Sequence, residues 1–487
     1  HAGRHAEHLT ALGLASGDPD LVFQGKANQL VTEIMQTTDR DAAERMLDLA
    51  EWLVVHPLRM NHEPLNQRIV RALEIIDNRG RPTIRARVYV EGGHCGMADV
   101  PCGSSKGSYE AFDLRDGDER YNGRGVRRAI ATIHDEIKPA LLGRNVTNQR
   151  RLDHIMAELD GTADKSRLGG NAILGVSMAA AQAAADSLGL PLYRYLSAGG
   201  HVLPVPQACL INGGVHAGND LDAQEFCVMP VGSPSFAEAT RLVCEVFEAL
   251  KGLLETRHGK LSTNFGEDGG FAPPLRTSKE AMDLLSEAVE KTGYTRDVVY
   301  GLDIAATGLY GRNRGTYRFD GQERTRDGMI AAMLDLIREY PAIVSIEDPL
   351  EQDDLDGWRV VVDSLPGVLV VGDDLTATNV ERLRLAIGHG SMNALLCKVN
   401  QAGSVTDAMD AARYAQHHRC PVVMSVRSGE TEDDILSDIS VALNAGVFKI
   451  GGPHGSDRGK SFNRFLEIED ELGREACYAG RDFSRLA

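Results

Sequence analysis

Charged residues stand at the ends of short apolar runs in the second half of the chain. Asp303, Glu347, Asp373 and Lys398 each follow such a run. Runs of this kind, separated by helix-length segments, are typical of buried parallel strands in a βα repeat. The carboxyl ends of those strands meet at one mouth, where active sites are built. The pattern therefore predicts that three carboxylates and one amine lie close together.

The three carboxylates favour a hard metal ion. Carboxylate oxygens, without His or Cys among the candidates, suit Mg²⁺ better than zinc. One acidic residue at a strand end more often caps a helix or is solvated. Three at successive strand ends shift the balance, so we expect Asp303, Glu347 and Asp373 to bind the metal.

Basic residues follow the neighbouring runs. Lys398 lies where burial and nearby cations are expected to lower its pKa, which suits a general base. Lys449 ends the run VFK and suits a substrate carboxylate. Arg427 and Ser428 follow the apolar run that lies between those of Lys398 and Lys449. An Arg followed by a Ser suits a phosphoryl group. The predicted mouth therefore suits a small anionic substrate.

The elements that position these residues divide the chain into three parts. Residues 1–66 read as a helical extension, and 67–203 as an α+β domain in which Ile84, Ala86, Val88 and Val90 alternate along a half-buried strand. Residues 204–487 alternate strands and helices to the end, as an α/β barrel does. The glycine-punctuated stretch 101–110 has the composition of a mobile lid.

Composition narrows the function class. A net charge of −18 over 487 residues argues against nucleic-acid and membrane surfaces as partners. No apolar run approaches the roughly 20 residues that cross a bilayer, and no secretory signal is visible at the start. The eight scattered cysteines fit reduced thiols rather than a disulfide framework. We therefore expect a cytoplasmic protein.

Several ordered motifs together carry a family resemblance. The segments SYEAFDLRDGD, LGGNAILGVSMA, GGFAPP, SIEDPLEQDDLDGW, VGDDLTATNVERL, LLCKVNQAGSVTDA and SGETEDD resemble the enolase family from about residue 75 to 480. This resemblance implies an enolase-like TIM-type barrel preceded by an α+β capping domain. It also implies a glycolytic lyase that turns 2-phosphoglycerate into phosphoenolpyruvate, and a homo-oligomer, dimer or larger.

The resemblance also implies roles for individual residues. Asp303, Glu347 and Asp373 match the ligands of a tightly held Mg²⁺, and Ser105 matches the loop serine that reaches a second Mg²⁺ when the lid closes. Lys398 matches the base that removes the proton α to the carboxylate, in keeping with the Lys or His base general to that superfamily. The remaining matches flank the substrate or contact its phosphate and carboxylate: His216, Glu225, Arg427, Ser428 and Lys449.

Two residues depart from the family pattern near the departing hydroxyl. The motif GDEGGFAP reads GEDGGFAP here, so that Asp268 stands where the family has Glu, and Glu267 precedes it. The motif SHRSGETED has Val426 in place of His. Asp is one methylene shorter than Glu, and valine donates no hydrogen bond, so the leaving-group half of the site is altered. Either Glu267 or Asp268 is expected to face the substrate.

Three hypotheses follow for the function. The first is an enolase-type lyase acting on 2-phosphoglycerate or a close analogue. The second is a divergent relative that makes a phosphonate enol ester, as a carboxyphosphonoenolpyruvate synthase of phosphonate biosynthesis does. The third is a catalytically silent binding protein, and the retained metal carboxylates and Lys398 speak against it.

Overall fold

The computed structural model describes residues 67–103 and 107–486 of the chain. The predicted helical extension, residues 1–66, and Ser105 of the predicted lid lie outside these described residues. Across the ranges that are described, no helix is both long and apolar enough to pass through a bilayer.

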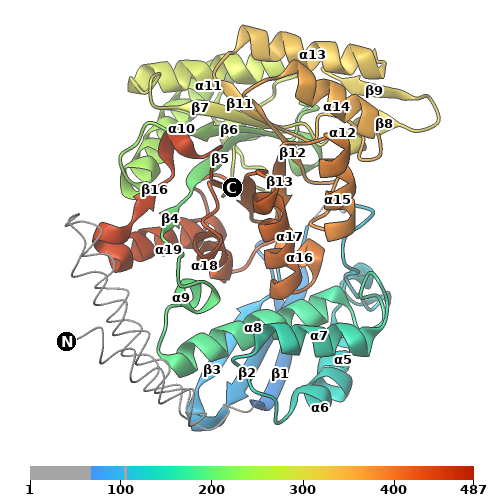
Figure 1. Cartoon of the computed structure of the whole chain (residues 1–487). Coiled ribbons are helices and arrows are strands. Elements are labelled where there is room, and N and C mark those ends of the chain that lie inside the picture. The colour runs from blue at the N-terminus through green and yellow to red at the C-terminus, as the bar shows by residue number, and fades with distance from the viewer. Residues whose placement is uncertain (1–66, 104–106, 487) are drawn as a thin grey trace.

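An antiparallel sheet of strand order β1-β2-β3 begins the described chain (β1 Gln67–Ile76, β2 Pro82–Val90, β3 Cys95–Asp99). The alternating residues Ile84, Ala86, Val88 and Val90 of β2 are all buried, as the sequence predicted. Their face meets α8 (Gly170–Leu188), where a Cβ on Gly175 would lie 3.3 Å from that of Ala86. Figure 1 shows α8 between this sheet and two barrel helices, α16 (Val399–Ala402) and α17 (Val405–His417).

Short helices complete this first domain. They follow the sheet in the chain and, with α8, surround its apolar face (α5 Arg127–Thr132, a π-helical turn Ile133–Ile137, α6 Lys138–Leu141, α7 Gln149–Asp160, α9 Leu192–Leu196).

The second part is a closed barrel with the strand order β11-β12-β13-β14-β15-β5-β6-β7. Its strands are short and almost entirely buried (β5 Val205–Asn212, β6 Glu225–Met229, β7 Val299–Asp303, β11 Ile343–Glu347, β12 Leu369–Gly372, β13 Ala394–Cys397, β14 Val422–Ser425, β15 Val447–Lys449). The predicted α/β barrel after an α+β domain is therefore confirmed.

Helices lie around the outside of the barrel (α10 Phe236–His258, α11 Ser278–Thr292, α12 Ala306–Leu309, α13 Arg326–Glu339, α14 Leu355–Ser364, α15 Val380–His389, α16 Val399–Ala402, α17 Val405–His417, α18 Ile435–Ala442, α19 Ser456–Leu472). A hairpin sheet projects beside α12 and α13 (β8 Tyr310–Gly311, β9 Thr316–Phe319, β10 Gln322–Arg324), and β4 (Val202–Leu203) pairs with β16 (Cys477–Tyr478). Ser404 caps α17 by accepting a hydrogen bond from the Asp407 N–H at 3.1 Å.

One strand departs from the parallel βα repeat expected from the sequence. β6 runs antiparallel to both of its neighbours, β5 and β7. Asn212 at the end of β5 pairs with Glu225 at the start of β6, and Glu225 pairs in turn with Asp303. The first residue of β6, rather than its last, therefore lies at the mouth where the other strands end.

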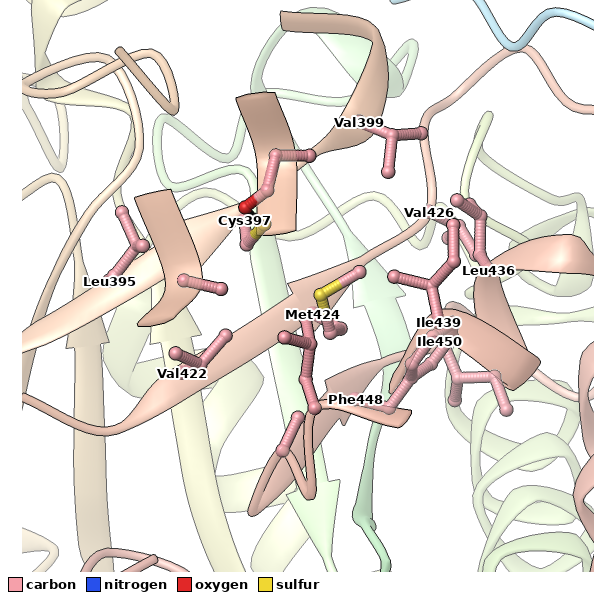
Figure 2. Close-up of a cluster of buried hydrophobic side chains, with 14 of the residues drawn as sticks. Leu395, Cys397, Val399, Val422, Met424, Val426, Leu436, Ile439, Phe448 and Ile450 are labelled. Carbon is pink, nitrogen blue, oxygen red and sulfur yellow. Dashed lines mark hydrogen bonds between the residues drawn. The ribbon is translucent and has the colours of Figure 1, made fainter. Parts of the chain in front are cut away.

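Successive side chains of each strand point alternately into the barrel and toward the surrounding helices. Leu395 and Cys397 of β13 belong to the apolar cluster against the surrounding helices, which Figure 2 shows, whereas Ala394 and Leu396 belong to a separate cluster inside the barrel. The next residue, Lys398, continues the alternation on the inner side. Local strand geometry thus turns Lys398 toward the mouth.

Candidate active site

Five strand ends deliver charged side chains to one mouth. Asp303, Glu347 and Lys449 are the last residues of β7, β11 and β15, and Asp373 and Lys398 directly follow β12 and β13. All five are buried. Glu347 and Asp303 are paired in register across their strands. The spatial arrangement predicted for these residues is therefore present.

The ammonium group of Lys449 lies among carboxylates. Its Nζ donates to Asp303 Oδ2 and to Glu347 Oε2, each at 2.7 Å, and Glu225 Oε1 is 3.1 Å away. Burial lowers the pKa of Lys449, but Asp303 and the other carboxylates raise it well above its ordinary value. Lys449 therefore stays charged and offsets the repulsion between Asp303 and Glu347.

The acidic residues fit a hard cation. Glu347 Oε1 is buried and has no hydrogen-bond partner, so one carboxylate oxygen is left with its lone pairs unsatisfied. Burial, followed by the nearby Asp303, raises the pKa of Glu347 well above its ordinary value. Asp373 also lies in a second acidic group, with Asp348 and Asp374, whose ligand atoms are all within 4.8 Å of one another. A buried oxygen-only donor set of this kind suits Mg²⁺.

Lys398 forms an ion pair with Asp373. Although burial raises the pKa of Asp373, Lys398 lowers it to about 2. Burial lowers the pKa of Lys398, as the sequence suggested, but Asp373 raises it more, and the net shift is upward. The predicted lowering depended also on neighbouring cations, which this balance of Lys398 and Asp373 does not include, and it stays a prediction. Gln401 Nε2 donates to the other oxygen of Asp373 at 2.8 Å and fixes its orientation.

A cluster of basic and hydroxyl groups lies on the side of the mouth nearest the first domain. Arg427 is buried, donates to Asn400 Oδ1 at 2.9 Å and pairs with Glu110 at 3.3 Å. Arg79, from the turn between β1 and β2, donates to Ser428 Oγ at 3.0 Å. Guanidinium and hydroxyl donors of this kind suit phosphate oxygens. No sequence pattern pointed to Arg79.

His216 and Asp268 form a buried dyad in the wall of the same pocket. The His216 ring Nδ1 is 2.6 Å from Asp268 Oδ2, and Asn212 Nδ2 donates to the same oxygen at 2.9 Å. Burial raises the pKa of Asp268, but His216 lowers it more, so the carboxylate is ionised. Burial lowers the pKa of His216, whereas Asp268 raises it to a net value above the ordinary 6.5.

The loop that carries Glu267 and Asp268 turns the Asp268 side chain toward the mouth. Asp268 lines the pocket at the mouth, whereas the Glu267 side chain points to Arg79 Nη1 at 3.3 Å and Arg81 Nη2 at 3.8 Å. The turn is tight, because Gly270 N–H donates to Asn212 Oδ1 and a Cβ on Gly266 would lie 2.5 Å from Asn212. Glu267 therefore serves the contact between domains.

Arg458, near the start of α19, ties two loops of the site together. Its guanidinium donates to the backbone carbonyls of Arg427 at 2.7 Å, Glu267 at 3.0 Å and Ser428 at 3.2 Å. It is 3.9 Å from Asp268 and almost wholly inaccessible to solvent. No sequence signal pointed to this residue, because its glycine-rich surroundings resemble a loop.

Val426 lies at the border between the pocket and the apolar core. It lines the pocket with His216, Asp268 and Lys398, yet it also belongs to the cluster that contains Leu436 and Ile439 of α18 (Figure 2). This part of the wall therefore offers contact surface and no hydrogen bond. The pocket is lined by Gly103, His216, Gln224, Glu225, Asp268, Lys398, Ser425, Val426, Arg427, Ser428, Lys449 and Gly451.

Comparison with protein families gives matches over nearly the whole described chain. The model of the enolase N-terminal domain matches residues 68–196, and that of the enolase C-terminal TIM barrel domain matches residues 200–487.

Individual relatives agree with these matches. The enolase of Methanocaldococcus jannaschii is 48% identical over 413 residues, which are 85% of this chain and 96% of the relative. The enolase of Mycobacterium leprae is 49% identical over 415 residues, 84% of this chain and 96% of the relative. That of Pyrococcus furiosus is 48% identical over 421 residues, 86% of this chain and 97% of the relative.

Proposed function

Because the chain belongs to the enolase family, it is a carbon–oxygen lyase that converts 2-phosphoglycerate to phosphoenolpyruvate, and we propose that Lys398 removes the proton α to the carboxylate. The observation that carries this role is the burial of Lys398 at the mouth, beside Asp373 and within one pocket with Arg427 and Lys449. An amine held in this way lies where a small anion enters.

The enolase family uses Mg²⁺, and the donors of this chain fit it. The proposed ligands of a tightly held ion are Asp303, Glu347 and Asp373, a choice supported by the unpartnered Glu347 Oε1. A second Mg²⁺, which enters with the substrate, is assigned to Ser105 by resemblance alone, because that residue lies outside the described residues. When bound, the ions supply positive charge that stabilises the dianion formed by proton removal.

Anchoring of the substrate falls to the basic side chains. Arg427 and Ser428 are proposed to hold the phosphate, supported by their position beside Arg79, and Lys449 to hold the carboxylate. Lys449 would then exchange part of its contact with Asp303 and Glu347 for the substrate. The departing hydroxyl is assigned to Glu225, Asp268 and His216, which line the same pocket.

Three further proposals concern the whole protein. The division at residues 67–203 and 204–487 is supported by the two family matches, which meet between 196 and 200. A homo-oligomer, dimer or larger, and a cytoplasmic location rest on the family resemblance and on composition. Sedimentation of the purified chain tests the oligomer.

The first experiment follows the ultraviolet absorbance of the enol product from 2-phosphoglycerate with Mg²⁺. Lys398→Ala is expected to lower turnover by about 10²–10⁴-fold, the contribution typical of a positioned base. Lys291→Ala, at an exposed lysine of α11, is the matched control and should keep wild-type turnover. Full activity in Lys398→Ala would refute the base assignment. Exchange of the α-proton with deuterated water, without product, would point to a different leaving group.

A further inference from the structure

The His216–Asp268 dyad has the arrangement of a proton donor and its orienting anion. Asp268 Oδ2 already accepts bonds from His216 Nδ1 and Asn212 Nδ2, and its pKa is held below the ordinary range. An ionised carboxylate has no proton to give. His216 Nε2, by contrast, is buried and has no hydrogen-bond partner within the protein. An unsatisfied buried nitrogen in a pocket wall needs a ligand atom to bond.

We propose that His216 is the general acid that protonates the departing hydroxyl, and that Asp268 acts as its positioning residue rather than as the acid itself. This proposal rests on the enolase reaction proposed above. His216, Asp268, Glu225 and Lys398 all line one pocket. The family places Glu where this chain has Asp268, and Oδ2 of the shorter side chain is bound by both His216 and Asn212.

The step balances with groups already present. After Lys398 has taken the α-proton, the bond between the β-carbon and its oxygen breaks, and the electron pair leaves with the oxygen. The proton on Nε2 of the His216 imidazolium moves to that oxygen, so that water departs while the carbon–carbon double bond forms. His216 is left neutral and regains its proton from solvent.

The charged neighbours of His216 raise its pKa and so favour its protonated form. Burial opposes the charge, but Asp268 in the loop between α10 and α11, Glu225 at the start of β6 and Asp303 at the end of β7 all favour it. The Glu267 N–H donates to the His216 carbonyl at 2.9 Å, so the backbone of the Asp268 loop also fixes the segment that carries the imidazole. Hydrogen bonds of both the side chains and the backbone therefore fix the position of the dyad.

A leaving-group experiment tests the acid role directly. His216→Gln is expected to lower phosphoenolpyruvate formation by about 10²–10⁴-fold while α-proton exchange with deuterated water stays within about threefold of wild type. The analogue with chlorine in place of the β-hydroxyl needs no proton to leave. Its elimination by His216→Gln should therefore stay within about threefold of wild type. His417→Gln, at an exposed histidine of α17, is the control.

Asp268→Asn tests the positioning role. Without the anion the pKa of His216 falls, so the loss of hydroxyl elimination at alkaline pH should begin at a lower pH than in the wild type. Chloride elimination should show no such shift. A merely structural role for Asp268 would lower both reactions at every pH without moving the profile.

Other outcomes overturn the proposal. Equal loss of hydroxyl and chloride elimination in His216→Gln would make His216 a substrate-binding residue. Hydroxyl elimination at the wild-type rate in that variant would assign the proton to another group, with Glu225 the nearest candidate. A wild-type protein that exchanges the α-proton yet forms no product would also overturn it. Failure of the proposed enolase reaction would be distinguishable from failure of the His216 role. In that case the wild type would neither exchange the α-proton nor dehydrate 2-phosphoglycerate.

Discussion

At the scale of single residues, Arg458 holds the loop of Arg427 and Ser428 and the loop of Asp268 in one position. Its three backbone acceptors lie on both loops. Arg458→Met should leave the carbonyls of Arg427 and Glu267 without this donor, at about 1–3 kcal/mol each, whereas the Ser428 carbonyl keeps a hydrogen bond from Asn78 Nδ2 at 3.2 Å. A displacement of about 1 Å can cost ~10²-fold in rate, so kcat/KM should fall by about 10–100-fold. Arg359→Met, at an exposed arginine of α14, should change neither activity nor melting temperature. Unchanged kinetics in Arg458→Met would show that the two loops keep their positions without the Arg458 hydrogen bonds.

The positions of the strand-end residues could be predicted because one local rule places them. A charged residue after a buried apolar run must lie at an end of the barrel, and this holds for Asp303, Glu347 and Lys449. Arg79 and Asn212 could not be found in this way. Arg79 reaches Ser428 from the turn of another domain, and Asn212 acts through a loop that only the fold brings near. Roles in the reaction stay predictions for all of these residues.

At the scale of elements, the direction of β6 was beyond the reach of sequence pattern. The run EFCVM has the same buried character in either direction, and all five of its residues are buried. Only pairing with β5 and β7 shows that it is antiparallel. The consequence is chemical, because the reversal brings Glu225 to the mouth. Resemblance to the family suggested Glu225 as a site residue, whereas the rule of strand carboxyl ends would have missed it.

The contact between β3 and α8 depends on a glycine. A Cβ on Gly96 would lie 2.0 Å from the Ala179 carbonyl oxygen and 2.3 Å from the Ala183 nitrogen, both of them backbone atoms. Gly96→Ala should therefore push the sheet from the helix and lower the free energy of unfolding by about 1–3 kcal/mol or more. Thermal and urea denaturation followed by circular dichroism measure this loss.

Gly252→Ala is the matched control for that change. Gly252 lies inside α10, and a Cβ there would meet nothing within 4 Å. Alanine in a helix interior is favoured over glycine by about 0.5–1 kcal/mol. This variant should therefore be slightly more stable than the wild type. Equal stability of Gly96→Ala and Gly252→Ala would mean that β3 and α8 have room to adjust.

At the scale of the whole molecule, the two domains meet through a half-buried carboxylate. Asp433 of the barrel accepts the backbone N–H of Asp99 from β3 at 2.7 Å and that of Ile435 at 2.9 Å. Burial raises the pKa of Asp433 to about 7. Because the folded protein then binds more protons than the unfolded chain, stability should fall as pH rises from about 4 to about 7. Asp433→Asn should remove that part of the decline, measured as the difference between the two unfolding curves across pH. Parallel curves would contradict it.

Metal binding should couple the three strands β7, β11 and β12 into one stable unit. The carboxylates of Asp303, Glu347 and Asp373 at these strand ends repel one another, and ion pairs with Lys449 and Lys398 offset part of that charge. Because Mg²⁺ binds the native site and not the unfolded chain, at about 100 times its Kd it should raise the free energy of unfolding by about 2.7 kcal/mol. The melting temperature should therefore rise with Mg²⁺ concentration in the wild type.

Glu347→Gln separates this binding from a general salt effect. The amide keeps the shape of the carboxylate but removes one charge and the unpartnered Oε1 acceptor, so the Mg²⁺-dependent rise should shrink to a small fraction of the wild-type rise. Asp327→Asn, at an exposed acid in the first turn of α13, should leave the rise intact. Differential scanning calorimetry with and without Mg²⁺ compares the shifts rather than the absolute melting temperatures, because Glu347→Gln also relieves repulsion from Asp303. An equal rise in all three proteins would mean that Mg²⁺ acts elsewhere on this acidic chain, and the assignment of Glu347 as a ligand would fail.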